Sequence, residues 1–496
     1  MRYCQFYKAL LWSVCLSVLL IGCETQFTRQ YKVEREFYRA RKLQESVMLN
    51  PKIADQLAYQ NAIGAYEAIL QKYASNSYNT SIEAVKKQCY VAISELWLLQ
   101  SENEKAIEVY ERFLKKYPND KDVGPLIHFA NARSNEQIFN IDKAISEYQT
   151  VFDNHSEIAD PESPKVSVLN LPLRMARLER GRGSKNQGKS YGYYREALNY
   201  YSSLEKQFPG TPTAFAAGYY SASIYLDQQQ WQDAVTTFSK LIKGFPDRGE
   251  VPQLMLTVAS LYSDGLRDAV KAGRIYDQII QKFPEHVVEG YAHLGKARTL
   301  QNTKKYKQAI EKMKFIIDRF PQNVTLCASA QLSMAHCYEE QGDWQRALVE
   351  YKWVYENYST TAQGLFAPTY IGQTYRERGE GRLAKTAFRD AVDFYQRIIK
   401  KYPKTTLAGT AQEYVINIYL IQEDWKNAEK AVEALETIYP GSRSKINTAL
   451  LKGKIYENIH SVDQAIDVYK QLISEFPSHP ILSEVRDKIG SLQRLR

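Results

Sequence analysis

The chain has 496 residues, of which 65 are Lys or Arg and 56 are Asp or Glu, giving a net charge of +9. With 44% apolar and 24% charged residues, its composition is that of a folded, water-soluble protein. The basic residues are spread along the chain without a dense run, so a solvated surface is favoured over nucleic-acid binding. The 37 Tyr residues indicate aromatic packing between structural elements.

The first residues are predicted to form a bacterial export signal, residues 1–22. Arg2 and Lys8 provide a basic start, and the apolar run Ala9–Gly22 has 14 residues. A bilayer span needs about 20 residues, so this run is too short to be a comfortable membrane helix. The run ends in Leu20-Ile21-Gly22-Cys23, which resembles the lipobox of bacterial lipoproteins. The resemblance implies that Cys23 carries the lipid and begins the mature protein.

Two alternatives to the lipoprotein remain, an ordinary signal peptide with a chance cysteine and an uncleaved anchor. Residue 24 is Glu and not the Asp that retains Gram-negative lipoproteins at the inner membrane. By that resemblance we expect a lipid-anchored protein of the bacterial outer membrane that faces the periplasm. Residues 23–34 are predicted to be a short lipid-proximal tether. Cys89, Cys327 and Cys337 do not form a disulfide framework and are expected to be small buried packing residues.

A helical pattern recurs eleven times along the rest of the chain. Each copy has Ala, an aromatic or apolar residue four positions later, an aliphatic or aromatic residue three further, and usually an aromatic residue four after that. The copies start at Ala62, Ala106, Ala144, Ala197, Ala234, Ala272, Ala309, Ala347, Ala391, Ala428 and Ala465. They are 37 or 38 residues apart, except for two intervals of 44 and one of 53. Such a period predicts a solenoid, in which each unit buries its apolar face against its neighbours.

Residues 214–246 show what one unit contains. Two apolar stripes with helical spacing flank the polar stretch 227–230, which predicts a helical hairpin with a short turn. Pro246 ends the second helix because proline cannot extend it, and eight copies end with such a proline. The small Ala222 and Ala234 are expected to let the two helices approach closely.

These residues resemble the tetratricopeptide repeat. In that family the first helix has a small residue followed three positions later by an aromatic, here Ala222 and Tyr225. The second helix has Ala, an aromatic, an apolar residue and a closing proline, here Ala234, Phe238, Leu241 and Pro246. The resemblance implies an all-α fold, a tetratricopeptide-type solenoid of helical hairpins that forms a right-handed superhelix of about eleven repeats.

The predicted solenoid covers residues 35–479 and has three irregular places. The 44-residue intervals carry about two extra helical turns, and near residues 384–402 these turns are expected to lengthen the second helix. Residues 154–190 form a loop-rich excursion, whose prolines and glycines surround a short helix near 166–179. Residues 480–496 are predicted to form a capping helix over the last repeat.

One motif points to nucleotide binding and is set aside. Residues 183–190 read Gly-Ser-Lys-Asn-Gln-Gly-Lys-Ser and match the phosphate-loop pattern. That loop needs a buried strand before it and a helix N-terminus to receive the phosphates. Residues 175–180 instead read as an amphipathic helix. A basic loop that contacts an acidic partner or lipid headgroups is therefore favoured, and no nucleotide is expected.

Catalytic and metal chemistry has no support in the sequence. The seven His residues are dispersed, and none has the spacing of a metal site. Adjacent carboxylates such as Glu339 and Glu340 are explained by solvation at helix ends. We predict no enzyme activity, no metal and no cofactor.

The resemblance to tetratricopeptide proteins implies a binding surface on the first helix of each repeat, beside its packing positions. Carried over residue by residue, it predicts these partner-binding residues: Tyr219, Ser223, Tyr291, Arg298, Gln301, His336, Glu339, Phe366, Gln373, Arg376 and Asn417. Polar, aromatic and charged groups on rigid helices suit an extended peptide or a helix. A solvated surface is an equally good interpretation of any single one of these residues.

The lipobox and the repeats together resemble the lipoprotein of the outer-membrane β-barrel assembly machine and the periplasmic repeat protein linked to the Tol-Pal system, although this chain has more repeats than either. The resemblance implies a non-enzymatic scaffold that holds an envelope protein or peptide in its groove for assembly or export. The alternative is a glycan-binding lipoprotein that serves exopolysaccharide secretion.

Overall fold

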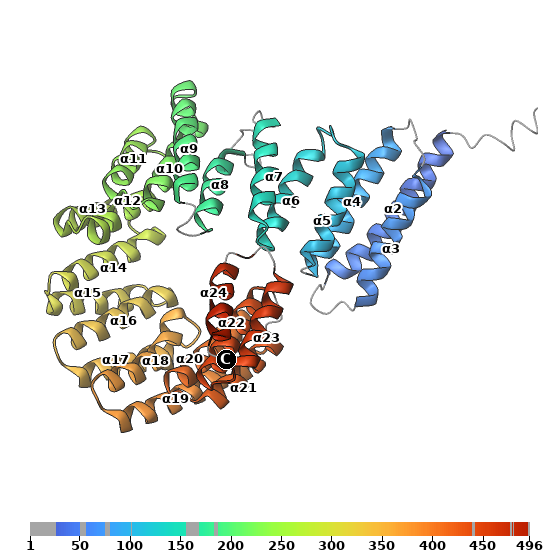
Figure 1. Cartoon of the computed structure of the whole chain (residues 1–496). Coiled ribbons are helices and arrows are strands. Elements are labelled where there is room, and N and C mark those ends of the chain that lie inside the picture. Colours follow the sequence, from blue (N-terminus) through green and yellow to red (C-terminus); the bar gives the residue numbers. More distant parts are fainter. Residues whose placement is uncertain are drawn as a thin grey trace, which may run out of the picture. The chain divides into compact units, whose positions relative to one another are not determined.

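The structure is a computed structural model. It describes residues 26–49, 56–74, 80–100, 102–154, 168–182, 187–438, 442–476, 479 and 481–494. The predicted signal segment and Cys23 lie outside these ranges. Within them the secondary structure is helical and contains no strand, which confirms the all-α fold. The helices fall into two compact units, α2 to α7 and α8 to α24 (Figure 1).

Three helical hairpins make up the first unit. We call the first helix of each hairpin its A helix and the second its B helix. The hairpins are α2 (Gln26–Met48) with α3 (Gln56–Lys72), α4 (Thr80–Leu99) with α5 (Asn103–Lys116), and α6 (Gly124–Gln137) with α7 (Ile141–Asn154). The B helices α3 and α5 also pack on the following A helices α4 and α6, so the core runs continuously from α2 to α6.

The second unit contains eight hairpins and a final helix. The first four are α8 (Leu171–Arg180) with α9 (Gln187–Gln207), α10 (Pro212–Asp227) with α11 (Trp231–Gly244), α12 (Val251–Ser260) with α13 (Ala269–Lys282), and α14 (Val287–Asn302) with α15 (Tyr306–Arg319). The next four are α16 (Val324–Glu340) with α17 (Trp344–Asn357), α18 (Ala362–Glu377) with α19 (Gly381–Lys401), α20 (Thr406–Ile421) with α21 (Trp425–Ile438), and α22 (Ser442–Asn458) with α23 (Val462–Glu475). The short segments η2 (Val168–Asn170) and η4 (Leu261–Gly265) precede α8 and follow α12, and α24 (Leu482–Gln493) ends the unit. Consecutive A helices from α12 to α20 contact one another.

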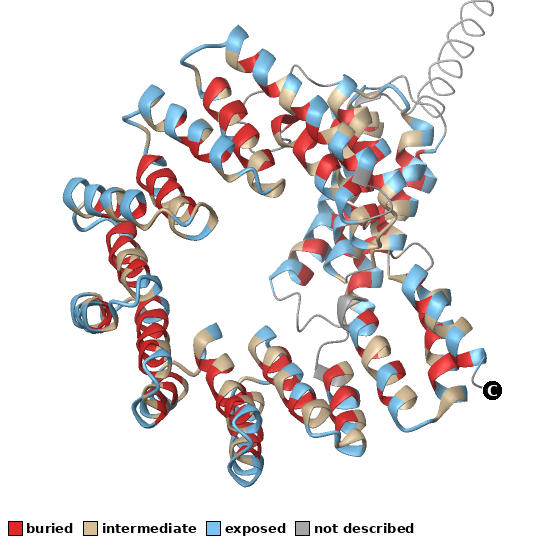
Figure 2. Ribbon diagram, turned by 60° about the vertical axis from the view of Figure 1, so that its left-hand side comes forward, coloured by how far each residue is buried: buried red, intermediate tan, exposed pale blue. Residues whose placement is uncertain are grey.

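The recurring sequence pattern forms the B helices. In all eleven copies its first three residues are buried, as Ala347, Tyr351 and Val354 show with no exposed surface. These residues share one face because their spacing of four and three matches the helical turn. Figure 2 shows the result, with buried positions on the sides of the ribbons that meet other helices and exposed positions on the opposite sides. The predicted packing positions are thus confirmed.

The turn inside each hairpin requires one left-handed residue. In each of the eight hairpins whose turn the structure fully describes, one residue has φ between 55° and 80°. Gly342 and Gly379 fill this position in two hairpins, and the other six have a residue with a side chain, such as Gln229. The turn is tight enough that the A and B helices stay in contact along their length.

Three joints between hairpins share a construction. At these joints the proline that ends the B helix is followed by a residue with positive φ, namely Gly210, Glu285 or Lys404, and proline followed by positive φ is the signature of a type II turn. The next residue caps the following A helix. At Thr211 the hydroxyl donates to the carbonyl of Phe208, over 2.6 Å, and accepts a hydrogen bond from the backbone amide of Ala214.

Four helices, α2, α8, α19 and α24, bear on the boundaries and irregular places that the sequence predicted. α2 begins at Gln26, so its first turns fall within the segment predicted to be a tether. The predicted excursion contains α8, which pairs with α9 and serves as the A helix of the fourth hairpin. α19 has 21 residues where the other B helices from α11 to α23 have 14, which agrees with the expected lengthening. α24 packs on α23 at the position predicted for the cap.

Candidate functional site

The predicted partner-binding residues all lie on A helices of the second unit. They come from α10 (Tyr219 and Ser223), α14 (Tyr291, Arg298 and Gln301), α16 (His336 and Glu339), α18 (Phe366, Gln373 and Arg376) and α20 (Asn417). We call this set the A-helix row. Because α14, α16, α18 and α20 contact one another in sequence, most of the row lies on neighbouring elements.

Some members of the row are occupied by contacts within the protein. The guanidinium of Arg298 donates to the hydroxyl of Ser333 over 3.4 Å, and the amide of Gln301 donates to the Glu340 carboxylate over 3.0 Å. Both hydrogen bonds link α14 to α16. Ser223 is buried and donates to the backbone carbonyl of Tyr219. These three side chains therefore contribute to the structure of the solenoid.

Other members of the row are accessible to a partner. Tyr219 is 43% exposed and meets Phe238 edge to face, which fixes its ring at the surface. Arg376 and Asn417 are exposed, and Arg376 reaches the backbone carbonyl of Ile421 on α20. Tyr291 and Gln373 are half-buried. The accessible groups are an aromatic ring, amides and a guanidinium, which suit hydrogen bonding and stacking with a peptide.

His336, Glu339 and Phe366 come together in one cluster with two residues that the sequence did not single out. The hydroxyl of Tyr351 donates to Glu339 over 2.5 Å and lies 2.7 Å from Nδ1 of His336. Tyr370 donates to the same carboxylate oxygen over 3.0 Å, and the ring of Phe366 lies 5.0 Å from that of Tyr370. The cluster joins α16, α17 and α18.

The electrostatics of this cluster keep its carboxylate charged. Burial acts to raise the pKa of Glu339, but hydrogen bonds from His336, Tyr351 and Tyr370 outweigh it and hold that pKa below its ordinary value. Burial and the neighbouring Glu339 raise the pKa of Tyr351 and of Tyr370. Both tyrosines therefore remain protonated donors at neutral pH, and Glu339 remains an acceptor.

The contact between Glu339 and Tyr351 recurs in two other hairpins. Glu136 accepts from Tyr148 over 3.0 Å, and Glu457 accepts from Tyr469 over 2.5 Å. In each case the A-helix carboxylate precedes the B-helix tyrosine by twelve residues. In the hairpin of α14 and α15 the same two positions are Gln301 and Met313, and Gln301 bonds to α16 instead. A search for Glu and Tyr twelve residues apart would have found these pairs in the sequence.

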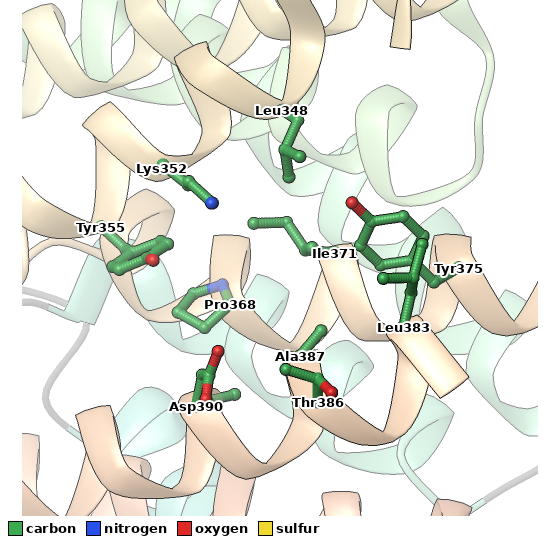
Figure 3. Close-up of a pocket in the computed structure, with 11 residues that line it drawn as sticks. Leu348, Lys352, Tyr355, Pro368, Ile371, Tyr375, Leu383, Thr386, Ala387 and Asp390 are labelled. Carbon is green, nitrogen blue, oxygen red and sulfur yellow. The ribbon is translucent and has the colours of Figure 1, made fainter. Parts of the chain in front are cut away.

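A small pocket lies where α17, α18 and α19 meet, and the sequence did not predict it (Figure 3). Its volume is about 190 Å³ and its apolar walls include Leu348, Ile371 and Leu383. The charged residues Lys352 and Asp390 also line it. The added turns of α19, residues 381–387, supply Leu383 and the neighbouring Thr386 and Ala387, so the longer interval in the sequence builds one wall.

A second, polar pocket of about 700 Å³ lies at the ends of the hairpins near α13 to α16. Its lining includes Asp264, Arg267, Asn302, Tyr306 and Glu340. It is open to solvent, and most of the residues that line it carry hydrogen-bonding groups.

The motif at residues 183–190 is only partly described. Residues 183–186 lie outside the described ranges, and α9 begins at Gln187, so Gly188, Lys189 and Ser190 lie in its first turn. The element before the motif is α8, and no strand occurs in the described part of the chain. The buried strand that a phosphate loop requires is therefore missing from these residues.

The described residues also bear on metal binding, membrane spanning and thiol reactivity. They contain no group of three or more His, Cys, Asp or Glu side chains that could hold a metal ion, and none of their helices is long and apolar enough to cross a bilayer. Cys89, Cys327 and Cys337 are buried free thiols, and burial raises the pKa of Cys89 and Cys337 to about 12. Such thiols are poor nucleophiles at neutral pH.

The model of the tetratricopeptide-repeat family matches residues 89–120, 216–248, 370–405 and 449–479. Each segment covers the C-terminal part of an A helix (α4, α10, α18 or α22) and the B helix that follows it (α5, α11, α19 or α23). In these four segments the chain matches the tetratricopeptide repeat. The matched segments place the same sequence signature in both compact units, and the hairpins between them share the buried pattern described above.

Solved tetratricopeptide and related structures align loosely with the chain. Yeast Tom70 has 11% identity and a TM-score of 0.39, and the alignment covers 93% of this chain and 96% of Tom70. A tetratricopeptide repeat protein from Parabacteroides merdae has 14% identity and a TM-score of 0.35, with 58% and 91% covered. Human IFIT1, solved with m7Gppp-AAAA, has 12% identity and a TM-score of 0.32, with 90% and 96% covered. No curated protein matches the chain.

Proposed function

We propose that this protein is a membrane-attached, non-enzymatic scaffold whose A-helix row binds a protein or peptide partner. The observation that carries the proposal is the presentation of Tyr219, Phe366, Arg376 and Asn417 from A helices of a rigid tetratricopeptide stack. Repeat proteins use such successive A helices as an extended binding surface. The matching family model describes a repeat that is typical of scaffolds, and it indicates no catalytic family.

We further propose that the pocket beside α19 anchors one partner side chain, as a contact separate from the A-helix row: its residues Pro368, Ile371 and Tyr375 lie about 140–200° around α18 from Phe366. Its volume of about 190 Å³ and its apolar walls suit a single aromatic or aliphatic side chain. The charged side chains of Lys352 and Asp390 in its lining provide polar contacts for that anchor. Apolar pockets with a few convergent polar groups are the usual form of specific binding sites.

The cellular setting of the proposal comes from the N-terminal sequence. A lipid on Cys23 would hold the scaffold at the bacterial outer membrane, where it faces the periplasm and collects an envelope protein for assembly or export. The predicted lipobox and Glu24 support this setting. Several acyl chains on one cysteine suffice for stable anchoring, whereas a single chain is marginal.

Site-specific photo-crosslinking in cells tests the binding surface. A photoreactive phenylalanine is placed at Tyr219, Phe366 or Asn417 in the A-helix row, and at Val270 or Val349 as matched controls. The controls are 64% and 63% exposed and lie on B helices. We expect the row to capture one or a few defined protein bands and the controls to capture none of them. Equal capture at both sets of positions would refute the row as a binding surface.

Membrane attachment is tested separately. Metabolic labelling with palmitate should mark the wild-type chain and not the Cys23→Ser variant, and fractionation should place the labelled chain in the outer membrane. Palmitate labelling that persists in the variant, or an unlabelled wild-type chain, would contradict lipidation at Cys23. The crosslinking result would still stand, because it depends on the folded repeats alone.

Glycan binding is the second candidate, and the polar pocket near α13 to α16 favours it. Its lining of carboxylates, amides, Arg267 and the ring of Tyr306 offers the hydrogen bonds and stacking that sugars need. Calorimetry with a panel of oligosaccharides tests this candidate. The binding of each sugar is compared between the wild type and the Tyr306→Ala variant. The candidate fails if no polymer binds, or if binding is unchanged in the variant.

A further inference from the structure

The helix α2 has two opposite faces of different chemistry. Val33, Ala40 and Val47 are fully or almost fully buried and, with the nearly buried Gln44, pack the helix against α3 and α4. At about 100° per residue these positions form one stripe. The helix is thus attached to the solenoid by a single side.

The opposite side of α2 carries tyrosines and basic residues in a second stripe. Tyr31, Arg35, Tyr38, Lys42 and Leu49 are spaced by four, three, four and seven residues, so they lie in one line about 180° from the buried stripe. All five are exposed, with 59% for Tyr31, 60% for Tyr38 and 86% for Leu49. We call this line the outer stripe. Large aromatic and apolar side chains held in a row by a helix are unusual for a surface that meets only water.

The charge of α2 is positive on this side. The helix has six basic residues and three acidic ones. Each acidic residue is engaged within the protein: Glu36 pairs with Lys72 of α3, Glu45 pairs with Lys42 and Arg41, and Glu34 accepts from Gln30. Arg35 and Arg39 have no acidic partner among the residues that the structure describes. Their guanidinium groups therefore face solvent with their charge uncompensated.

The position of α2 in the chain places it beside a membrane. Its first residue, Gln26, follows Cys23 by three positions and the apolar run Ala9–Gly22 by four. Whether that run is cleaved before a lipidated Cys23 or kept as an anchor, at most about 14 Å of extended chain separates the attachment point from the start of the helix. Among the described helices, α2 is the one next to this attachment point.

We propose that the outer stripe of α2 binds the surface of an anionic lipid membrane. Tyr31, Tyr38 and Leu49 enter the headgroup region, where amphipathic aromatic rings are favoured, and Arg35 of the stripe and the neighbouring Arg39 pair with lipid phosphates. This second contact orients the first repeats on the membrane to which the N-terminus is attached. The inference rests on the membrane attachment proposed above, and it adds a lipid-binding site that is separate from the A-helix row.

Vesicle binding by a chain without lipid tests this site. The chain from residue 24 onward retains every described helix, and it is mixed with vesicles of phosphatidylcholine alone or with phosphatidylglycerol added. We expect sedimentation with the anionic vesicles, weak binding to the neutral ones, and loss of binding in high salt. The Arg35→Glu/Arg39→Glu variant should bind the anionic vesicles roughly tenfold more weakly or worse, since each basic residue near such a surface contributes about 1 kcal/mol.

The control is Lys385→Glu/Arg389→Glu, which makes the same charge change at the same spacing on the exposed face of α19. It should bind as the wild type does. A Tyr31→Ser/Tyr38→Ser variant leaves the charge unchanged and should also weaken binding. Circular dichroism of each variant verifies folding.

Three results would overturn the proposal: equal binding of the α2 and α19 charge variants, no preference for anionic vesicles, or self-association of the wild type that Arg35→Glu/Arg39→Glu abolishes. The last would assign the stripe to a second copy of the chain. Because the chain in this test has no lipid, its failure leaves palmitate labelling of Cys23 and crosslinking at the A-helix row unaffected.

Discussion

A tyrosine buried in a B helix needs a partner for its hydroxyl, and the facing position of the A helix provides one. Glu136, Glu339 and Glu457 fill that position in three hairpins, and each accepts a hydrogen bond from the tyrosine twelve residues later. An unsatisfied buried hydroxyl would cost about 1–3 kcal/mol. Packing therefore explains part of the polar character of the A helices. Glu339 belongs to the A-helix row and also accepts the hydrogen bond of a buried tyrosine.

Replacing Tyr351 with Phe tests this coupling. The change removes the hydroxyl that donates to Glu339 and lies beside Nδ1 of His336, while the ring stays in place. We expect the free energy of unfolding to fall by about 1.5–3 kcal/mol, the range for hydrogen bonds to charged groups. Urea unfolding followed by circular dichroism measures it. Tyr338→Phe on α16 is the control, because no hydrogen bond of its hydroxyl is found among the described residues; a similar loss in the control would disprove the assignment.

The same carboxylate makes stability depend on pH. The pKa of Glu339 lies below its ordinary value of 4.5, so its charged form favours folding. That contribution is complete above the ordinary value and is lost as the pH falls through the pKa of the folded protein. We therefore expect the stability difference between wild type and Glu339→Gln to be largest near neutral pH and to shrink below about pH 4.5. Urea midpoints across this range measure it, with the exposed Glu311→Gln as a control; a constant difference would contradict the prediction.

At the scale of elements, close approach of A and B helices decides which small residues are required. Ala222 and Ala234 are fully buried where α10 meets α11, as the sequence predicted. At Gly453 of α22 even alanine is too large, because a Cβ there would lie against the ring of Tyr469 on α23. Gly273 of α13 is also helical, but a Cβ there would meet nothing within 4 Å. The same residue type thus has a packing role in one helix and none in the other.

Alanine substitution at these two glycines should change the stability of the chain in opposite directions. Gly453→Ala should destabilise the last hairpin by about 1–3 kcal/mol, because the ring of Tyr469 has to move out of a packed core. Gly273→Ala should stabilise the chain by about 0.5–1 kcal/mol, since alanine loses less backbone entropy in a helix. Thermal unfolding of both variants against the wild type measures the signs. Destabilisation by both would show that backbone conformation, and not the contact with Tyr469, explains Gly453.

At the scale of the whole molecule, stability is distributed over neighbouring hairpins. In the second unit each B helix from α9 to α21 packs on the A helix before it and on the A helix after it, and the buried residues form a series of clusters. In such an arrangement energies couple mainly between nearest neighbours. α24 buries Leu482, Val485 and Leu492 where it packs on α23.

How much of the fold and of the candidate site could be predicted from the sequence depends on how far apart along the chain the contacting residues lie. The B helices follow from the repeated pattern, because residues four and three apart share a face whatever surrounds them. α8 was not recognised as an A helix, because its ten residues carry only a short apolar stripe after a segment rich in proline. The pocket beside α19 was not predicted, since it depends on how far the added turns project over α17 and α18. Likewise, the sequence named Arg298 and Gln301 as partner-binding residues, but the distances between A helices decide that they bond to α16.

Nearest-neighbour coupling predicts that a substitution that disrupts the packing of α24 destabilises only the hairpin next to it. Val485 of α24 is completely buried, so Val485→Asp places a charge in the interface with α23 at a cost of several kcal/mol and should detach α24. Hydrogen exchange measured by mass spectrometry should then speed up in α22, α23 and α24, while α10 to α17 keep the protection they have in the wild type. The exposed Arg486→Asp, one residue away, controls for the change in charge. If protection instead fell equally along the whole second unit, its eight hairpins would unfold as one cooperative body, and the energetic independence of distant repeats would have to be abandoned.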